Sequence, residues 1–287
     1  ISDEILKRVV ESYRRIRNTL RFLLANIADF DIRQQAMPVA QWLEIDRYAL
    51  ALVTRLQTEV QHDYSRYEFH AVVQKLQAFC SEDLGGFYLD ILKDRLYTTA
   101  PNSSGRRSAQ NALYHITQAL TRLMAPILSF TGEEVWALLG QQQSSVFESV
   151  WYELPKLPAA DTRLTQDWEV ICAWRARVNK RLEDSRSAGN IGSSLAAEIN
   201  IHAAGSDYDV LARLGDDLRF VMITSRAGVK RANSEADQHI EVLVSANAKC
   251  ERCWHYREDV GSDAAHPQLC GRCASNLFGS GEARTHA

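Results

Sequence analysis

The fold class of this chain is set by its opening stretch, Asp3-Glu-Ile-Leu-Lys-Arg-Val-Val-Glu-Ser-Tyr-Arg-Arg-Ile-Arg-Asn-Thr-Leu-Arg-Phe-Leu23. Apolar residues recur here every three or four positions, which is the period of one buried helix face. They are Ile5, Val9, Tyr13, Ile16, Leu20, Leu23 and, just beyond, Ile27. Ser2 is a suitable N-cap for such a helix, and Asp3 and Glu4 suit the positive end of its dipole.

The helical pattern continues through the first half of the chain. The same period predicts further helices over about 39–61, 67–80, 87–97, 108–123 and 131–139. Gly85 and Gly86 are expected to break or kink the chain, residues 100–105 to form a loop, and Pro126 to restart the helix. We therefore expect a helical bundle over residues 1–157.

The composition changes after Pro155 and Pro158, which we interpret as a domain boundary. One amphipathic helix is predicted from about 165 to 186. The period then becomes two, because Leu195, Ala197, Ile199 and Ile201 alternate with other residues as in a half-buried strand. Two apolar runs, 218–223 and 240–244, are further strand candidates. We expect a small α/β unit over residues 158–247.

The bulk composition restricts the class of protein. The chain has 287 residues, of which 46% are hydrophobic and 24% charged, with a formal net charge of −3. This balance argues against holding nucleic acid by a general positive field, although local basic stripes and stacking on unpaired bases stay open. No apolar run is long enough to cross a bilayer, and no signal-peptide pattern is present. The chain begins with Ile1 and its first methionine is Met37, so we expect a fragment or a processed product of a longer protein.

Two paired-cysteine motifs predict a metal module over residues 248–287. Cys250-Glu-Arg-Cys253 and Cys270-Gly-Arg-Cys273 are separated by sixteen residues, within the range that is typical of a structural zinc ribbon. Four thiolates provide the tetrahedral ligands of Zn²⁺ and leave no open position, so one structural ion is expected. Two redox pairs would need a βαβ context, and two disulfides an oxidising compartment; we disfavour both.

Basic and aromatic side chains beside the first cysteine pair are candidates for contact with RNA. They are Arg252, Trp254, His255 and Arg257. In the alternative interpretation, Arg252 and Arg272 balance the negative charge of the thiolates and Trp254 packs on the knuckle. The sequence leaves both interpretations open.

A stripe of arginines on the first helix is a second candidate RNA contact. Arg14, Arg17 and Arg21 share one side of the predicted helix, where they could hold a phosphate backbone. Ion pairs with neighbouring acids are the simpler interpretation for any one of them. Lys180 and Arg181 are weaker candidates of the same kind.

The other cysteines and histidines do not indicate chemistry. Cys80 and Cys172 fall among apolar residues and are expected in a core. His62, His70 and His115 lie on predicted helices without a matched partner, and we expect them at the surface. No catalytic constellation is recognisable.

Several blocks together resemble one enzyme family. Ile5-Leu-Lys-Arg-Val-Val-Glu11 and Tyr13-Arg-Arg-Ile-Arg-Asn-Thr-Leu-Arg-Phe-Leu23 are similar to the start of the anticodon-binding domain of isoleucyl-tRNA synthetases. Further blocks similar to class I synthetases for branched aliphatic amino acids are Phe87-Tyr-Leu-Asp-Ile-Leu-Lys-Asp-Arg-Leu-Tyr97 and Leu123-Met-Ala-Pro-Ile-Leu-Ser-Phe-Thr-Gly-Glu-Glu-Val-Trp136. Ile191-Gly-Ser-Ser-Leu195 resembles the start of the small α/β unit, and the two cysteine pairs resemble the terminal zinc module of the bacterial enzymes.

The resemblance implies the function of a whole enzyme, of which this chain is expected to supply only the tRNA-binding part. It implies a cytoplasmic isoleucine–tRNA ligase that uses ATP and Mg²⁺, with tRNA(Ile) and the upstream catalytic and editing domains as partners. HIGH-like and KMSKS-like motifs are absent here, so the chain alone is expected to be inactive. We expect its helical bundle and zinc module to grip the anticodon stem-loop, and we expect a monomer that does not bind membranes.

Two alternatives remain at the level of sequence. One is a stand-alone zinc-ribbon module that binds RNA or protein. The other is the equivalent region of another branched-chain class I synthetase, because the first blocks alone do not separate the isoleucine enzymes from the valine and leucine enzymes.

Overall fold

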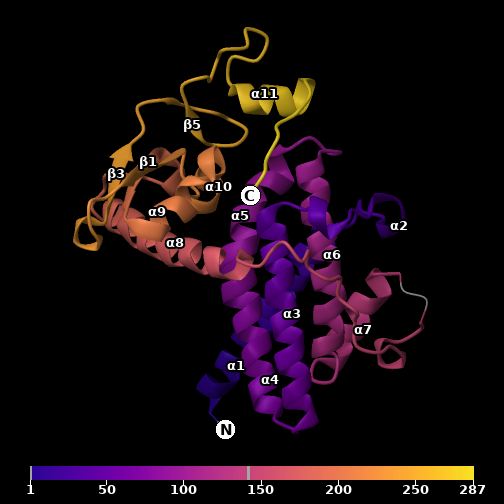
Figure 1. Ribbon diagram of the computed structural model, residues 1–287. Helices are drawn as coiled ribbons and strands as arrows, with labels where there is room; N and C mark the ends of the chain where they lie inside the picture. The colour runs from indigo at the N-terminus through magenta and orange to yellow at the C-terminus, as the bar shows by residue number, and fades with distance from the viewer. Residues whose placement is uncertain (1, 141–142) are drawn as a thin grey trace. The chain divides into compact units, whose positions relative to one another are not determined.

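The computed structural model describes residues 2–140 and 143–287 of the chain (Figure 1). Ile1, Gln141 and Gln142 lie outside the described residues. The chain forms two compact units, one of residues 1–90 with 107–160 and the other of residues 91–106 with 161–287. The fold is mainly helical, as the sequence predicts, with small sheets in the second unit only among the described residues.

The first unit is made of helices. They are α1 (Asp3–Asn26), α2 (Ile32–Gln35), η1 (Val39–Gln41), α3 (Glu44–Ser65), α4 (Phe69–Ala78), η2 (Phe79–Tyr88), most of α6 (Ser104–Met124), α7 (Ser129–Leu138) and η3 (Val146–Glu148). Helix α3 packs against α4, and α1 packs against α4, η2 and α7 (Figure 1). Pro126 falls between α6 and α7, where a restart was expected.

Helix α1 confirms its predicted cap but only part of its predicted buried face. The Ser2 hydroxyl accepts a hydrogen bond from the Ile5 amide at 3.4 Å. Leu20 and Leu23 are buried, whereas Ile5 and Val9 are 56% and 61% exposed. The expectation of one continuous buried face is therefore wrong for the first turns. Periodicity identifies a face of the helix and carries no information on where the packing partners end.

Of the break or kink expected at Gly85 and Gly86, the break does not occur. Residues Phe79–Tyr88 form a π-helix that continues α4 directly into α5 (Leu89–Thr98). A π-helix is wider than an α-helix because its hydrogen bonds span five residues. The two glycines lie inside this wider turn. The loop expected over 100–105 is also shorter, since α6 begins at Ser104.

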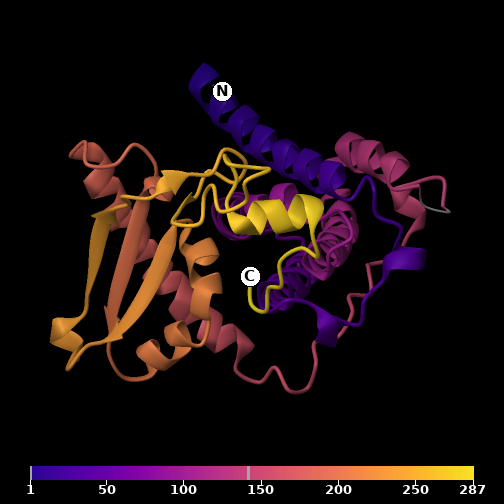
Figure 2. The ribbon, with the colours of Figure 1, turned by 90° about the horizontal axis from the view of Figure 1, so that it is seen from above.

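The second unit combines helices with two small sheets. Besides most of α5 it contains α8 (Leu164–Ser187), η4 (Ser194–Ala196), β1 (Ala197–Ala203), α9 (Gly205–Ala212), η5 (Gly215–Asp217), α10 (Leu218–Met222), β2 (Arg226–Arg231), η6 (Glu235–Asp237), β3 (His239–Val244), β4 (Ala248–Lys249), β5 (Tyr256–Arg257) and α11 (Gly271–Phe278). The larger sheet has the order β2-β1-β3, with β1 parallel to β2 and antiparallel to β3 (Figure 2).

The strand predictions in this unit are confirmed in two cases and wrong in one. Strand β1 occurs where the alternating apolar pattern predicts it, and β3 occurs at the apolar run 240–244. The run 218–223 is the short helix α10, which ends at Ile223 in the left-handed conformation with φ 53°. A short apolar run fits a buried helix as well as a strand, and here all five residues of α10 are buried.

Helices cover one face of the three-stranded sheet. Helix α8 packs on β3, and α9 and α10 pack on β2. Ile199 and Ile201 of β1 are fully buried on this covered face. The alternate residues of β1 therefore point to the opposite, open face. Among the described residues, no helix has the length and apolar character of a membrane span.

Candidate metal centre and nucleic-acid interface

The four predicted zinc ligands lie together in the second unit. Cys250, Cys253, Cys270 and Cys273 are all buried, and their sulfur atoms lie within 4.8 Å of one another. The Sγ atoms of Cys253 and Cys270 are 3.7 Å apart, and none of the four forms a disulfide. A tetrahedral Zn²⁺ with Zn–S bonds of about 2.3 Å requires sulfur–sulfur distances of about 3.8 Å. The cluster therefore has the size that zinc requires.

Each cysteine pair is held in a tight backbone turn. In the first turn the Trp254 amide donates to the Cys250 carbonyl at 2.9 Å, and Trp254 takes a left-handed φ of 66°. The second turn starts helix α11, with Cys270 at its N-cap. A Cβ at Gly271 would lie 2.9 Å from the carboxylate of Asp259, which instead accepts the Gly271 amide hydrogen at 3.0 Å. Glycine at position 271 thus allows the Asp259 carboxylate to approach the backbone of this turn closely.

The sulfur atoms influence one another electrostatically. Hydrogen bonds from the neighbouring thiols of Cys270 and Cys273 hold the pKa of Cys253 well below its ordinary value. Conversely, sharing a proton with Cys253 raises the pKa of Cys270 to about 12. Zn²⁺ binds thiolates and not thiols, so its binding to these four residues would release the thiol protons. The residues present fit a four-thiolate zinc ion.

Arg272 of the second pair belongs to a buried ionic cluster. Its guanidinium donates to both carboxylate oxygens of Asp94 at 2.7 and 2.9 Å, and Arg284 reaches the same carboxylate at 2.5 Å. Glu282 lies 3.3 Å from Arg272 and 3.0 Å from Arg284. Burial alone would raise the pKa of Asp94, but the two guanidinium groups outweigh it and hold this pKa well below its usual range. The cluster connects the zinc turn to α5 and to the C-terminal segment within the second unit.

The four RNA candidates next to the first cysteine pair differ in accessibility. Trp254 is 60% exposed, and the Nζ atom of Lys249 lies 5.5 Å from its ring centroid. Arg252 and Arg257 are half-buried; Arg252 donates to the Tyr97 carbonyl at 3.4 Å. His255 is 2% exposed and lies 3.7 Å from Asp94, and burial lowers its pKa to about 4. A neutral, buried imidazole is poorly suited to contact RNA directly.

The arginine stripe on α1 is present in the first unit. Arg14 and Arg21 are exposed, and Arg14 pairs with Glu11 at 3.1 Å. Arg17 is tied more firmly, because it lies 2.6 Å from Glu134 and donates to the Tyr13 hydroxyl at 3.1 Å. The stripe therefore offers two accessible cations and one that is already engaged.

Lys180 and Arg181 lie on α8 in the second unit. Both side chains are exposed, and Arg181 has only a long contact of 3.8 Å with Asp184. Packing therefore holds neither of these two side chains in one place.

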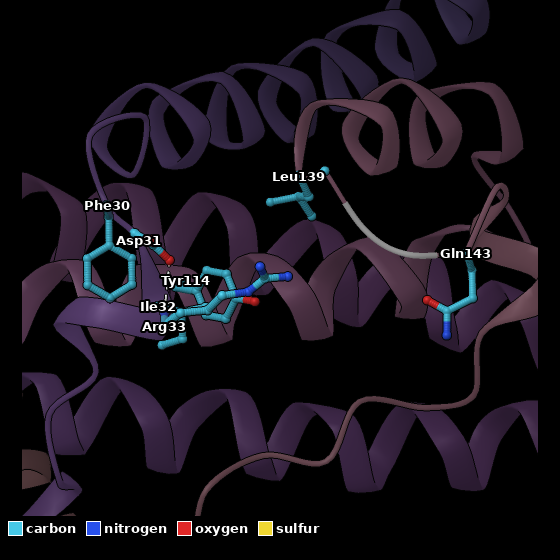
Figure 3. Close-up of a pocket in the computed structure, with 8 residues that line it drawn as sticks. Phe30, Asp31, Ile32, Arg33, Tyr114, Leu139 and Gln143 are labelled. Atoms are coloured by element: carbon cyan, nitrogen blue, oxygen red, sulfur yellow. Dashed lines mark hydrogen bonds between the residues drawn. The ribbon is translucent and has the colours of Figure 1, made fainter.

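A cavity of about 510 Å³ in the first unit was not predicted from the sequence. Figure 3 shows the side chains that line it. They are Phe30, Asp31, Ile32 and Arg33 from α2 and the segment before it, Tyr114 from α6, and Leu139 and Gln143 after α7. Two aromatic rings, a guanidinium group and a side-chain amide are the groups that stack on and hydrogen-bond to an unpaired base.

The comparisons with known proteins define the class to which this chain belongs. A family model described as "Anticodon-binding domain of tRNA ligase" matches residues 46–201, more than half of the chain. A second model, "Zinc finger found in FPG and IleRS", matches residues 248–276 and includes all four cysteines. The chain belongs to the family of anticodon-binding domains of tRNA ligases.

Within this family of anticodon-binding domains, the chain is similar to one kind of tRNA ligase. The chain is 59% identical over all 287 residues to the isoleucine–tRNA ligase of Burkholderia multivorans and 60% identical to that of Paraburkholderia phymatum, and it covers 30% of each. The ligase of Aromatoleum aromaticum is 59% identical and is covered over 31% of its length. The chain thus spans about a third of these curated relatives. The zinc-finger match and the four-cysteine cluster together suggest a structural zinc ion.

Proposed function

We propose that this chain is the part of an isoleucine–tRNA ligase that binds tRNA(Ile) and reads its anticodon. The observation that carries this proposal is the match of residues 46–201 to the anticodon-binding family, in a chain whose full length aligns with isoleucine–tRNA ligases. The complete protein would attach isoleucine to its tRNA with ATP and Mg²⁺ on catalytic and editing domains outside these residues. Its location would be the cytoplasm, and the chain would act as a monomer.

In the first unit, we assign the contacts to the tRNA phosphates and the contacts to its bases to different side chains. The exposed Arg14 and Arg21 would hold phosphates, with Arg17 available only if it leaves Glu134. The cavity around Phe30 and Tyr114 would receive an unpaired anticodon base. Phosphate contacts fix register and base contacts provide identity, so both are needed for selective reading.

In the second unit, we propose a smaller surface that also contacts RNA bases and phosphates. Trp254 is exposed enough to stack on a base, and Arg252 and Arg257 lie beside it in the sequence. Lys180 and Arg181 would add backbone contacts. His255 is better assigned to the interior, where it supports the turn that carries Trp254.

We also propose that Cys250, Cys253, Cys270 and Cys273 hold one Zn²⁺ with a structural role. The ion would fix the two turns and thereby the orientation of Trp254. Four thiolates leave no position for a substrate, so the ion would supply folding energy and no chemistry. The functional division that we propose is residues 1–157 for anticodon binding, 158–247 for the small α/β part and 248–287 for the zinc module.

The test is a binding titration of the 287-residue chain with tRNA(Ile) and with the same tRNA carrying a changed anticodon. We expect tighter binding of the unchanged tRNA at low salt. Arg21→Gln should weaken both affinities and lower the salt dependence, because it removes a phosphate contact. Arg33→Gln should reduce the preference between the two tRNAs.

Arg8→Gln is the matched control on the same helix. Arg8 is exposed and points about 140° away from Arg21 around α1, so this substitution should leave both affinities unchanged. Equal binding of the two tRNAs would contradict anticodon reading and favour a general RNA-binding module. No binding at low salt would contradict tRNA binding altogether.

A further inference from the structure

A second group of metal-ligand side chains lies on the open face of the three-stranded sheet. His202 of β1 stands opposite His239 of β3 in the antiparallel register, and Asn200 stands opposite Glu241. Residues opposite each other, and residues two apart along a strand, point to the same face. His202, His239 and Glu241 therefore share the face opposite to Ile199 and Ile201, away from the four cysteines in the sequence and outside both assigned surfaces.

The three donor atoms converge on one point. The Nε2 atom of His202 lies 3.3 Å and that of His239 lies 3.9 Å from Oε1 of Glu241. One ligand atom from each residue falls within 4.8 Å of the others. A tetrahedral ion with bonds of about 2.0–2.2 Å to nitrogen and oxygen requires donor–donor distances of about 3.4 Å. Small side-chain rotations would therefore suffice to seat an ion among them.

The atoms around these donors orient them as in known metal centres. The Nδ1 atom of His239 lies 2.8 Å from the Asp237 carbonyl, which can only accept, so Nδ1 carries a proton and, in the neutral ring, Nε2 is the nitrogen with the free lone pair. The second oxygen of Glu241 accepts hydrogen bonds from Asn200 at 2.9 Å and Lys230 at 3.4 Å. Metal-binding imidazoles and carboxylates are typically held by such outer contacts.

The two histidine rings lie side by side. The rings of His202 and His239 stack with centroids 4.0 Å apart. The Nε2 atom of His202 is buried and makes no well-directed hydrogen bond. A cation would satisfy this nitrogen.

We propose that His202, His239 and Glu241 form a second metal site, which binds a divalent transition-metal ion such as Zn²⁺. Two imidazoles and one carboxylate suit zinc, and three protein ligands leave a position open for water or an external donor. The site is thus open, in contrast to the closed set of four cysteines. It does not depend on tRNA binding, so either proposal can fail without the other.

The experiment is a calorimetric Zn²⁺ titration of the 287-residue chain after its cysteine site has been loaded with one equivalent of zinc. We expect one further equivalent to bind at neutral pH. His239→Gln and Glu241→Gln should each weaken this second event by at least about tenfold. His70→Gln, which alters an exposed histidine in the first unit, is the matched control and should leave it unchanged.

A spectroscopic measurement separates binding from misfolding. His239 is 55% exposed at its side chain, so His239→Gln should keep the wild-type thermal midpoint without zinc. In the unaltered chain, Zn²⁺ should shift the NMR ring signals of His202 and His239 and leave those of His70 in place. The proposal is overturned if no second equivalent binds, if both variants bind it as tightly as the wild type, or if the ring signals of His202 and His239 do not respond.

Discussion

His115 is a half-buried histidine of the first unit whose pKa is shifted by its surroundings. Its ring stacks on Trp42 with centroids 5.7 Å apart, and its Nδ1 atom lies 2.8 Å from the Tyr152 hydroxyl. Burial lowers the pKa of His115 to about 4 from an ordinary value of 6.5. His115 is half-buried, so the expected surface position is only partly right, because the residues that cover its ring come from distant parts of the chain.

This shift predicts a pH dependence of stability. Between pH 6.5 and 4 the unfolded chain binds a proton at His115 and the folded chain does not, so the unfolded state gains stability as the pH falls. The contribution of neutral His115 is fully present above pH 6.5 and is lost towards pH 4, at a cost of up to about 3 kcal/mol. Urea unfolding of the first-unit transition at pH 7 and 4.5 measures the loss.

His115→Gln provides the comparison. The variant should lose less stability between the two pH values than the wild type does, whatever other groups titrate in both proteins. The same pH dependence in wild type and variant would show that His115 does not carry the effect.

At the scale of the elements, the sequence predicts structure where one periodic signal dominates. The helices α1, α3, α6 and α8 have long apolar stripes and occur close to the predicted ranges. Strand β2 gave no such signal, because its sequence Arg226–Arg231 is mostly charged and glycine. The strand forms because it pairs with β1. Gly228 lies so close to β1 that a Cβ at this position would meet the Asn200 side chain at 2.9 Å. Such an edge strand is specified by pairing and not by its own pattern.

Some parts of the candidate site could be predicted from the sequence, and others could not. The four cysteines could be predicted because two short motifs contain the whole ligand set. The cavity could not, because Phe30, Tyr114 and Gln143 come from separate elements and are ordinary residues individually. The burial of His255 also depends on distant residues, namely Asp94 and Phe220, whose ring centroid lies 5.8 Å from that of His255.

The π-helix Phe79–Tyr88 allows a prediction about its two glycines. A Cβ at Gly85 would lie 3.0 Å from the Cys80 carbonyl oxygen, whereas a Cβ at Gly86 would lie 3.4 Å from that of Ser81. Alanine lowers the entropy cost of a helix by about 1 kcal/mol relative to glycine. At Gly86 this gain should remain, but at Gly85 the backbone contact should outweigh it. We expect Gly85→Ala to be less stable than Gly86→Ala by about 1–2 kcal/mol.

Chemical denaturation of the two variants tests this order, and each serves as the control of the other. Both remove one glycine from the same turn, so effects on the unfolded chain are nearly equal. Equal stabilities would mean that the π-helix adjusts freely at Gly85.

At the scale of the whole molecule, the two units depend on different sources of stability. The first has a large apolar core that includes Leu50, Leu113 and Leu120, all fully buried. In the last part of the second unit, the apolar side chains packed against the four cysteines include the half-buried Val260 and Leu269. A module of this size requires another source of stability, which we assign to the metal and to the ionic cluster around Asp94.

This difference predicts the outcome of zinc removal. Chelation should unfold residues 248–278, because binding and folding of small zinc modules are coupled and the four thiols no longer hold the two turns together. Hydrogen exchange should become fast in this segment, and the fluorescence of Trp254 should change, while protection in α3 and α6 stays. Cys253→Ser should produce the same pattern without chelator, whereas Cys172→Ser, which alters a cysteine of α8, should retain zinc and protection. Unchanged exchange over 248–278 after complete removal of zinc would contradict a structural role for the ion.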